Sequence, residues 1–167
     1  MKILVTGGAG YLGSVLIPKL LARGHQLRII DKGFFGRDHV KIFSKIDFIQ
    51  EDIRKIETDR VLLERLLEGC QCVIHLAAIS NDPSAELSSD LTMQVNYQAT
   101  CILAEAAKKK GIRFVFSSSC STYGFQKQDL KIDEEGALHP LTTYAISKVK
   151  SEEALLALKT PSWNPVI

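Results

Sequence analysis

Eight residues near the start of the chain read Thr6-Gly7-Gly8-Ala9-Gly10-Tyr11-Leu12-Gly13. Gly7, Gly10 and Gly13 follow the spacing G-x-x-G-x-x-G between an apolar run and an amphipathic stretch. In that order, such glycines permit a tight turn, a close approach of the backbone to a pyrophosphate, and close packing of helix and strand. The first N–H groups of the helix would hold the phosphates, because the helix dipole is positive there. The stretch therefore predicts a nucleotide-binding turn between a first strand and a first helix.

The rest of the chain alternates short apolar runs with longer amphipathic stretches, a pattern typical of a parallel α/β sheet. We expect strands at residues 2–6, 27–31, 47–50, 72–76 and 112–117, and helices at residues 11–23, 58–68, 89–110 and 142–159. The residues of the first helix expected to face the core are Leu12, Val15, Leu16 and Leu20. Together these elements predict a Rossmann-type, doubly wound parallel sheet in one domain over residues 1–167.

Acidic residues follow two of the predicted strands. Asp31 ends the second strand, where a carboxylate accepts hydrogen bonds from the ribose hydroxyls of an adenosine and repels a 2′-phosphate. It therefore favours NAD over NADP, although Lys32 and Arg37 weaken the preference because either could approach a phosphate. Asp52 and Ile53 follow the third strand and are expected to meet the adenine through a hydrogen bond and an apolar contact. The alternative is that Asp52 only caps its loop.

Tyr144 and Lys148 lie four residues apart in the last predicted helix. Such positions share one face of a helix, with Cβ atoms roughly 5–6 Å apart. The ammonium can therefore lie beside the phenol and favour its ionised form. A phenol that ionises readily is a general acid–base. With the glycine-rich turn, the pair indicates a nicotinamide-dependent enzyme that interconverts an alcohol and a ketone.

Composition narrows the function further. The net charge of +2 comes from 21 basic and 19 acidic residues without a basic stripe, so a nucleic-acid partner is not expected. No apolar stretch approaches the ~18–20 residues of a membrane span, so no membrane partner is expected. Four cysteines lack the spacing of a zinc site, and we predict no metal but buried, reduced thiols in a cytoplasmic protein. They are Cys70, Cys72, Cys101 and Cys120.

With these residues assembled, the chain resembles the extended short-chain dehydrogenase/reductase family, and most closely its nucleotide-sugar epimerase and dehydratase branch. The resemblance covers essentially all residues, and the glycine spacing is that of the extended members. Besides the opening motif and Asp31, it rests on Asp52-Ile53-Arg54, His75-Leu76-Ala77-Ala78, Val95-Asn96, Ser117-Ser118-Ser119, Tyr123-Gly124 and the pair Tyr144 and Lys148.

The resemblance implies a role for each matching residue. Tyr144 would be the acid–base on the substrate hydroxyl, Lys148 would assist it and bind the nicotinamide ribose, and Ser119 would hydrogen-bond the reacting oxygen. Asn96 would tie the central helix to neighbouring backbone, and His75 is interpreted as a core histidine. The residues expected to contact NAD are Gly7, Gly10, Tyr11, Leu12, Gly13, Asp31, Asp52, Ile53, Leu76, Ala77, Ala78, Asn96, Ser117, Tyr144 and Lys148.

One departure from the family pattern is informative. Dehydratases of this branch carry an Asp-Glu pair directly after the residue that matches Ser119, whereas this chain has Cys120 and Ser121. A 4,6-dehydratase is therefore disfavoured. The resemblance implies an NAD-dependent epimerase that acts on a nucleotide-linked sugar through a keto intermediate, and a homodimer when complete. An NAD(P)-dependent ketoreductase or dehydrogenase, or a non-catalytic nucleotide-binding protein, stays open as an alternative.

The end of the chain resembles the opening of a sixth strand, Pro165-Val166-Ile167, after a polar turn at residues 161–164. Because a chain rarely ends inside a buried strand, we expect these residues to be the N-terminal part of a longer enzyme. The family's substrate-binding part lies mostly in its C-terminal third, which would follow. We expect the isolated piece to retain some nucleotide binding, to associate through its open strand edge and to show no epimerase activity.

Overall fold

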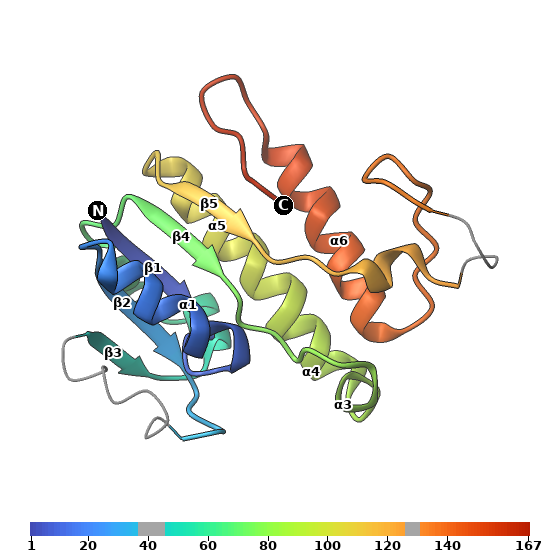
Figure 1. Ribbon diagram of the computed structural model, residues 1–167, viewed down its shortest axis with the longest axis horizontal. Coiled ribbons are helices and arrows are strands. Elements are labelled where there is room, and N and C mark those ends of the chain that lie inside the picture. The colour runs from blue at the N-terminus through green and yellow to red at the C-terminus, as the bar shows by residue number, and fades with distance from the viewer. Residues whose placement is uncertain (37–45, 126–130) are drawn as a thin grey trace.

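The computed structural model describes residues 1–36, 46–125 and 131–167. Its strands are all parallel and form one sheet in the order β3-β2-β1-β4-β5 (Figure 1). Their bounds are β1 Lys2–Thr6, β2 Gln26–Asp31, β3 Asp47–Gln50, β4 Cys72–His75 and β5 Arg113–Phe116. The chain order reverses between the neighbours β1 and β4. This confirms the predicted Rossmann-type sheet.

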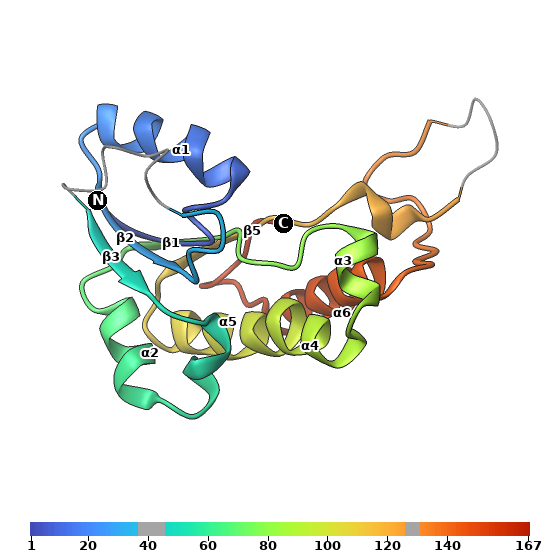
Figure 2. The same cartoon turned by 90° about the horizontal axis from the view of Figure 1, so that it is seen from below.

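Helices cover the two faces of the sheet unequally (Figure 2). Helix α1, Tyr11–Ala22, lies on one face, whereas α2, Arg60–Leu67, α5, Ala99–Lys109, and α6, Thr143–Leu158, lie on the other. The shorter helical segments are η2 Ile53–Glu57, α3 Asp82–Glu86, α4 Ser89–Met93, η3 Gln94–Gln98 and η4 Cys120–Tyr123. None of the helices in the described parts of the chain is both long and apolar enough to cross a bilayer.

The long central helix that the sequence predicts consists of α4, η3 and α5 in succession, and η3 is a π-helical turn. Such wider turns inside α-helices are frequent at functional sites. The short helix α3, which the sequence analysis did not predict, begins where the Asn81 side chain accepts a hydrogen bond from the Ser84 N–H. Pro83 stands in its first turn, a position that proline tolerates.

The larger hydrophobic cluster lies between the sheet and the helices α2, α5 and α6. Its members include Leu4, Val73, Leu103, Phe114 and Leu155. A smaller cluster lies beneath α1 and includes Ile3, Val5, Ile17, Leu27 and Ile29. The unequal clusters follow directly from the unequal cover of the two faces.

The prediction for the buried face of α1 is confirmed for Leu20, which packs against the smaller cluster, but is wrong for Leu12 and Val15. The helix buries Gly13 and Ile17, while Leu12 and Val15 are 56% and 51% exposed. The glycine explains the rotation, because a Cβ atom on Gly13 would lie 2.2 Å from the carbonyl oxygen of Gly8. Close packing of backbone on backbone, not apolar periodicity, therefore sets which side of α1 faces the sheet.

The last residues of the chain lie beside β5 (Figure 1). Val166 forms a parallel bridge with Val115, in which its N–H donates to the Phe114 carbonyl at 2.9 Å. The Phe116 N–H donates in turn to the Val166 carbonyl at 2.8 Å. The bridge lies where the sequence analysis placed the opening of a sixth strand.

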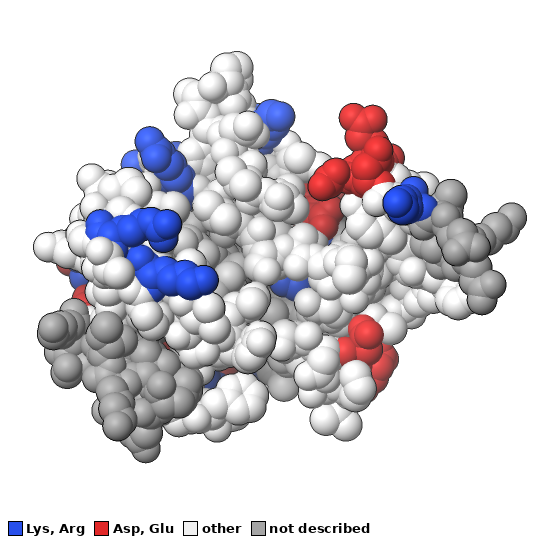
Figure 3. Space-filling view, viewed as in Figure 1, with Lys and Arg blue, Asp and Glu red and all other residues white. Residues whose placement is uncertain are grey.

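Opposite charges lie on opposite sides of the face that carries α1. Basic side chains gather on the α1 side of this face and acidic ones on the opposite side, while its centre is largely uncharged (Figure 3). The four cysteines are free. Cys70 and Cys72 are buried as expected, whereas Cys101 is half-buried and Cys120 is exposed, because it starts η4 at the surface.

Candidate functional site

The turn after β1 and the residues after β4 lie against each other at the carboxyl edge of the sheet. Gly7 has φ of +70°, and a Cβ atom there would lie 2.7 Å from the Ala77 nitrogen. Thr6 holds the other side, because its carbonyl accepts from the Leu76 N–H and its hydroxyl from the Ala77 N–H, both at 3.1 Å. Gly7 thus allows the contact between the turn and residues 76–78 that the sequence analysis assigned to one binding site.

The N-terminus of α1 is open toward this turn. Among the described residues, no side chain caps the helix at Gly10, and none of the first-turn residues is acidic. Tyr11 is 85% exposed and Leu12 is 56% exposed, so both flank the helix start without covering it. Unpaired N–H groups and the positive end of the helix dipole suit a phosphate group at this place.

Asp31 connects β2 to the glycine-rich turn. Its Oδ2 accepts a hydrogen bond from the Ala9 N–H at 2.9 Å, and its Oδ1 accepts one from the Gly33 N–H at 2.7 Å. A carboxylate offers about four acceptor positions, so two remain for further donors such as ribose hydroxyls. The structure therefore brings Asp31 to the predicted phosphate turn.

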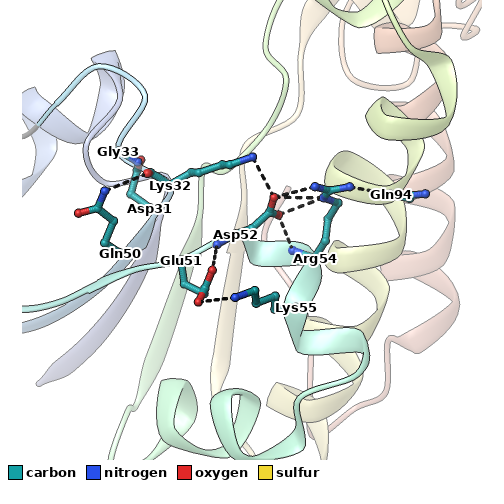
Figure 4. A network of polar contacts seen from close by, with 9 residues as sticks. All are labelled: Asp31, Lys32, Gly33, Gln50, Glu51, Asp52, Arg54, Lys55 and Gln94. Atoms are coloured by element: carbon teal, nitrogen blue, oxygen red, sulfur yellow. Dashed lines mark hydrogen bonds and ion pairs between the residues drawn. The ribbon is translucent and has the colours of Figure 1, made fainter.

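Asp52 is the centre of a charged network at the end of β3 (Figure 4). Its carboxylate caps η2 by accepting from the Arg54 N–H at 3.0 Å, and it pairs with the Arg54 guanidinium at 2.8 Å and the Lys32 ammonium at 3.2 Å. The hydrogen bond from Arg54 holds the pKa of the Asp52 carboxyl well below its usual value. Arg54 also donates to Gln94 of η3 at 3.0 Å.

This geometry matches the capping alternative that the sequence left open for Asp52. Its contact with adenine stays a prediction, as does that of Ile53, whose side chain is buried. Lys32, which could have approached a 2′-phosphate, is held by Asp52 instead. Arg37, the other cation considered, lies outside the described residues.

Asn96 connects three elements from the π-helical turn η3. Its side chain is buried and exchanges two hydrogen bonds with the backbone of Ile79, one accepted at 2.8 Å and one donated at 3.1 Å. It also donates to the Ser147 hydroxyl of α6 at 3.0 Å. Its carbonyl accepts from the hydroxyls of Thr100 and Ser151 at 2.6 and 3.1 Å. Asn96 thus ties the central helix to neighbouring backbone as expected, and also to the helix of Tyr144 and Lys148.

The sequence analysis missed both serines of α6 that take part in this arrangement. Ser147 and Ser151 are fully buried. The Ser147 hydroxyl donates to the Tyr144 carbonyl at 2.6 Å and accepts from the Asn96 side chain. The Ser151 hydroxyl lies within hydrogen-bond distance of the carbonyls of Asn96 and Ser147, at 3.1 and 2.8 Å. Their spacing of four residues, on the helix of Lys148, was the available signal, since it places two small polar groups on one face.

Tyr144 and Lys148 lie in the first two turns of α6, which starts where the Thr142 hydroxyl accepts from the Ala145 N–H at 3.1 Å. Both side chains are buried, with 8% and 3% exposed. The Lys148 Nζ lies 5.8 Å from the centre of the Tyr144 ring and 4.6 Å from that of Phe116. Burial lowers the pKa of Lys148 to about 8. The predicted pair is therefore brought together, and burial makes the Lys148 ammonium easier to deprotonate than an exposed one.

The serine segment, residues 117–119, leads from β5 into η4. The Ser117 carbonyl accepts a hydrogen bond from the Lys148 Nζ at 2.7 Å. The Ser118 hydroxyl donates to the carboxylate of Glu152, a residue that the sequence analysis did not consider. Ser119 caps η4, because its hydroxyl accepts from the Ser121 N–H at 3.2 Å. The segment that carries Ser119 thus lies directly against the helix of Tyr144 and Lys148.

Four of the segments described above lie at the carboxyl ends of parallel strands, where the chain order reverses between β1 and β4. Ligands of open α/β sheets bind outside this edge, at the place where the strand order reverses. The glycine-rich turn follows β1, Asp31 ends β2, residues 76–78 follow β4, and the serine segment follows β5. The structure therefore collects the predicted cofactor residues and the predicted acid–base residues around one edge of the sheet.

Comparisons with known proteins agree with this arrangement. The model of a family described as NAD dependent epimerase/dehydratase matches residues 3–165. A UDP-glucose 4-epimerase of Lactobacillus helveticus is 32% identical over 158 residues, which cover 93% of this chain and 46% of that enzyme. UDP-glucuronic acid decarboxylase 1 of Arabidopsis thaliana is 34% identical over 126 residues, covering 74% and 27%.

A solved structure gives the same result. The UDP-glucuronic acid 4-epimerase of Bacillus cereus, in complex with NAD, is 30% identical and superposes with a TM-score of 0.80, covering 95% of this chain and 51% of that chain. The chain spans about half or less of the length of these relatives.

Proposed function

Because the chain belongs to the NAD-dependent epimerase/dehydratase family, we propose that it acts as part of an NAD-dependent epimerase of a nucleotide-linked sugar. The observation that carries the proposal is the buried pair Tyr144 and Lys148 beside the serine segment, at the same sheet edge as the glycine-rich turn. A nucleotide-binding protein without catalysis would not require a buried lysine next to a buried tyrosine.

The residues of the chain fit NAD. The turn at Gly7 leaves no room for a side chain, and among the described residues no side chain caps the start of α1, where a pyrophosphate would bind. Asp31 has acceptor positions left for the adenosine ribose, and Lys148 would bind the nicotinamide ribose. A bound NAD⁺ would supply the hydride acceptor for the oxidation of a sugar carbon and, as NADH, the hydride donor for its reduction.

The proton chemistry falls to three residues. The Tyr144 side chain, ionised as phenolate, accepts the proton of a sugar hydroxyl while the carbon that carries it is oxidised to a ketone. It returns the proton when the ketone is reduced on its other face. The Lys148 ammonium stabilises the phenolate through its charge. The Ser119 hydroxyl holds the reacting oxygen by a hydrogen bond. If the keto sugar rotates in the site between oxidation and reduction, the product is the epimer and no cofactor is consumed.

A decarboxylase of a nucleotide-linked uronic acid is the second candidate, and similarity to the Arabidopsis decarboxylase supports it. It begins with the same oxidation and differs in the loss of carbon dioxide. A ketoreductase uses the same residues but consumes cofactor. A 4,6-dehydratase is disfavoured, because Cys120 and Ser121 stand where dehydratases carry their carboxylates.

The test is to incubate the protein, produced with its native downstream sequence, with UDP-, GDP- and dTDP-linked sugars and uronic acids. We expect an epimeric sugar by NMR, without net NADH and without carbon dioxide. Release of carbon dioxide would favour the decarboxylase, and net NADH turnover would favour the reductase.

Replacement of the acid–base residue tests the mechanism. Tyr144→Phe should abolish turnover and leave NAD affinity nearly unchanged, because only the group that transfers the proton is lost. Tyr97→Phe, a tyrosine of η3 outside the proposed machinery, is the matched control and should retain activity. A Tyr144→Phe enzyme that kept most of the wild-type rate would contradict the proposed chemistry.

A further inference from the structure

Helix α6 holds the serine segment at two consecutive residues. Lys148 donates to the Ser117 carbonyl at 2.7 Å, and one helical turn later Glu152 accepts from the Ser118 hydroxyl. Residues four apart on a helix lie on one face, so both bonds come from the same side of α6. The next residue, Ser119, is the one proposed to hold the reacting oxygen.

These two bonds decide where the serine segment lies. At its start, the Ser117 N–H donates to the His75 carbonyl at 3.2 Å, which continues the pairing of β4 and β5. Beyond that point the segment leaves the sheet, and it is hydrogen-bonded to α6 at the Ser117 carbonyl by Lys148 and at the Ser118 hydroxyl by Glu152. A hydrogen bond to a carboxylate is stronger than one between neutral groups. Glu152 therefore fixes the backbone that leads to Ser119.

Glu152 also affects Lys148. The Lys148 side chain is 3% exposed, and its burial disfavours the charged form, whereas the negative charge of Glu152 favours it. The other titratable groups that face Lys148 are Tyr144 on α6 and His75 on β4. His75 is itself buried, and its pKa is lowered to about 3 by burial and by Lys148, so it is neutral near pH 7. Glu152 thus provides the countercharge in this part of the fold.

We propose that Glu152 is a positioning residue of the active site, which holds the serine segment through Ser118 and supplies the negative charge that faces Lys148. The proposal rests on the proposed function, because the roles of Ser119 and Lys148 come from it. Glu152 acts through these residues and needs no contact with substrate or cofactor.

Three substitutions separate the two roles in the enzyme with its native downstream sequence. Ser118→Ala removes the hydrogen bond and keeps the charge. Glu152→Gln keeps an acceptor for Ser118 and removes the charge, and Glu152→Ala removes both. The matched control is Glu153→Gln, because Glu153 is the next residue of α6 and is exposed.

The expected results differ for each variant. Ser118→Ala should lower kcat about tenfold, since small displacements of a positioning group have effects of this size, and should leave the pH profile unchanged. Glu152→Gln should shift the basic limb of the kcat profile to lower pH by about half a unit or more, because Lys148 loses its proton earlier. Glu152→Ala should show both changes, and Glu153→Gln neither.

Two further readouts do not depend on turnover. NMR of labelled lysine side chains reports the titration of Lys148, and hydrogen exchange reports the order of residues 117–121. If the wild type converts no sugar, the proposed function fails while these readouts still test Glu152. The proposal is overturned if Ser118→Ala and Glu152→Gln, both folded by circular dichroism, match Glu153→Gln in exchange and in lysine titration.

Discussion

The two faces of the sheet differ in what packs against them. Helices α2, α5 and α6 cover one face, where Val73 and Phe114 are almost completely buried. Among the described elements, α1 is the helix that packs on the other face, and there Ile74 and Val115 of the same two strands are only half-buried (Figures 1 and 2). The helix-covered face therefore provides most of the rigid frame, and it is the face that carries Tyr144 and Lys148.

Buried polar groups show the same asymmetry. His75, Asn96, Thr100, Ser147 and Ser151 all lie on the helix-covered side. Every buried side-chain nitrogen and oxygen in the described residues has a hydrogen-bond partner. Because burial of a polar group is unfavourable without such partners, these bonds favour one relative position of β4, the central helix and α6. The difference between the faces thus indicates that packing on one side orients the proposed acid–base pair.

The largest effect on stability is expected when the aromatic ring of Phe114 is removed from the helix-covered face. Phe114 is 1% exposed, and its ring lies 5.9 Å from the ring of His75 and 6.3 Å from that of Trp163. Phe114→Ala should lower the free energy of unfolding by about 3–5 kcal/mol, from lost burial and the cavity left behind. Urea denaturation measures it. A loss below about 1 kcal/mol would mean that this face is not the rigid one.

The second test uses the pH dependence of stability, which depends on His75 on the same face. His75 is buried, with hydrogen bonds between its ring and the hydroxyls of Thr6 and Thr100 at 2.6 and 2.8 Å. Burial lowers its pKa to about 3, whereas an unfolded histidine titrates near ~6.5. Above that pH both states are neutral; below it the unfolded chain takes up a proton that the folded chain does not. Stability should therefore fall by about 1.4 kcal/mol per pH unit below ~6.5.

The measurement compares denaturation midpoints at pH 6.5 and 4.5. The wild type should lose about 2–3 kcal/mol more than His75→Gln over this interval. His139→Gln replaces an exposed histidine and should keep the wild-type slope. Equal slopes for all three proteins would show that His75 is not held neutral by the covered face.

How much of this the sequence predicts depends on the kind of interaction. All five strands lie within one residue of their predicted bounds, because apolar runs between turn residues are a local signal. The glycine-rich turn, Asp31 and the pair Tyr144 and Lys148 are likewise found from spacing. The exposure of Leu12 and Val15 on α1 was predicted wrongly, because contact between Gly13 and Gly8 leaves no trace in apolar periodicity.

The missed residues depend on contacts between distant segments. Glu152 bonds a serine 34 residues away, and Arg54 bonds Gln94 across 40 residues. The π-helical turn that carries Asn96 also has no simple sequence pattern. Only their tertiary partners reveal these roles.

The third test concerns the charged network that links Lys32, after β2, through Asp52 to η2 and η3 (Figure 4). We expect NAD to bind at least tenfold more tightly than NADP, about 1.4 kcal/mol, because Asp31 repels a 2′-phosphate and Asp52 holds Lys32. Asp52→Asn should release Lys32 and reduce this ratio. Glu51→Gln, whose carboxylate pairs with Lys55, is the control and should leave it unchanged. Calorimetry measures both affinities; equal affinities in the wild type would contradict the assignment to Asp31.

The smallest expected effect is on the face that α1 covers only in part. Val115 and Val73 belong to neighbouring strands, but Val73 is fully buried on the covered face and Val115 is half-buried on the other. Substitution by alanine removes the same two methyl groups from each. We expect Val73→Ala to lower the free energy of unfolding by about 2 kcal/mol. Val115→Ala should lower it by less than about 1 kcal/mol, because less apolar area returns to water at Val115 and no closed cavity forms there.

Urea denaturation of both variants in the 167-residue chain measures the difference. Equal costs would mean that this face is covered in solution, and the midpoint would then depend on protein concentration if a second copy covers it.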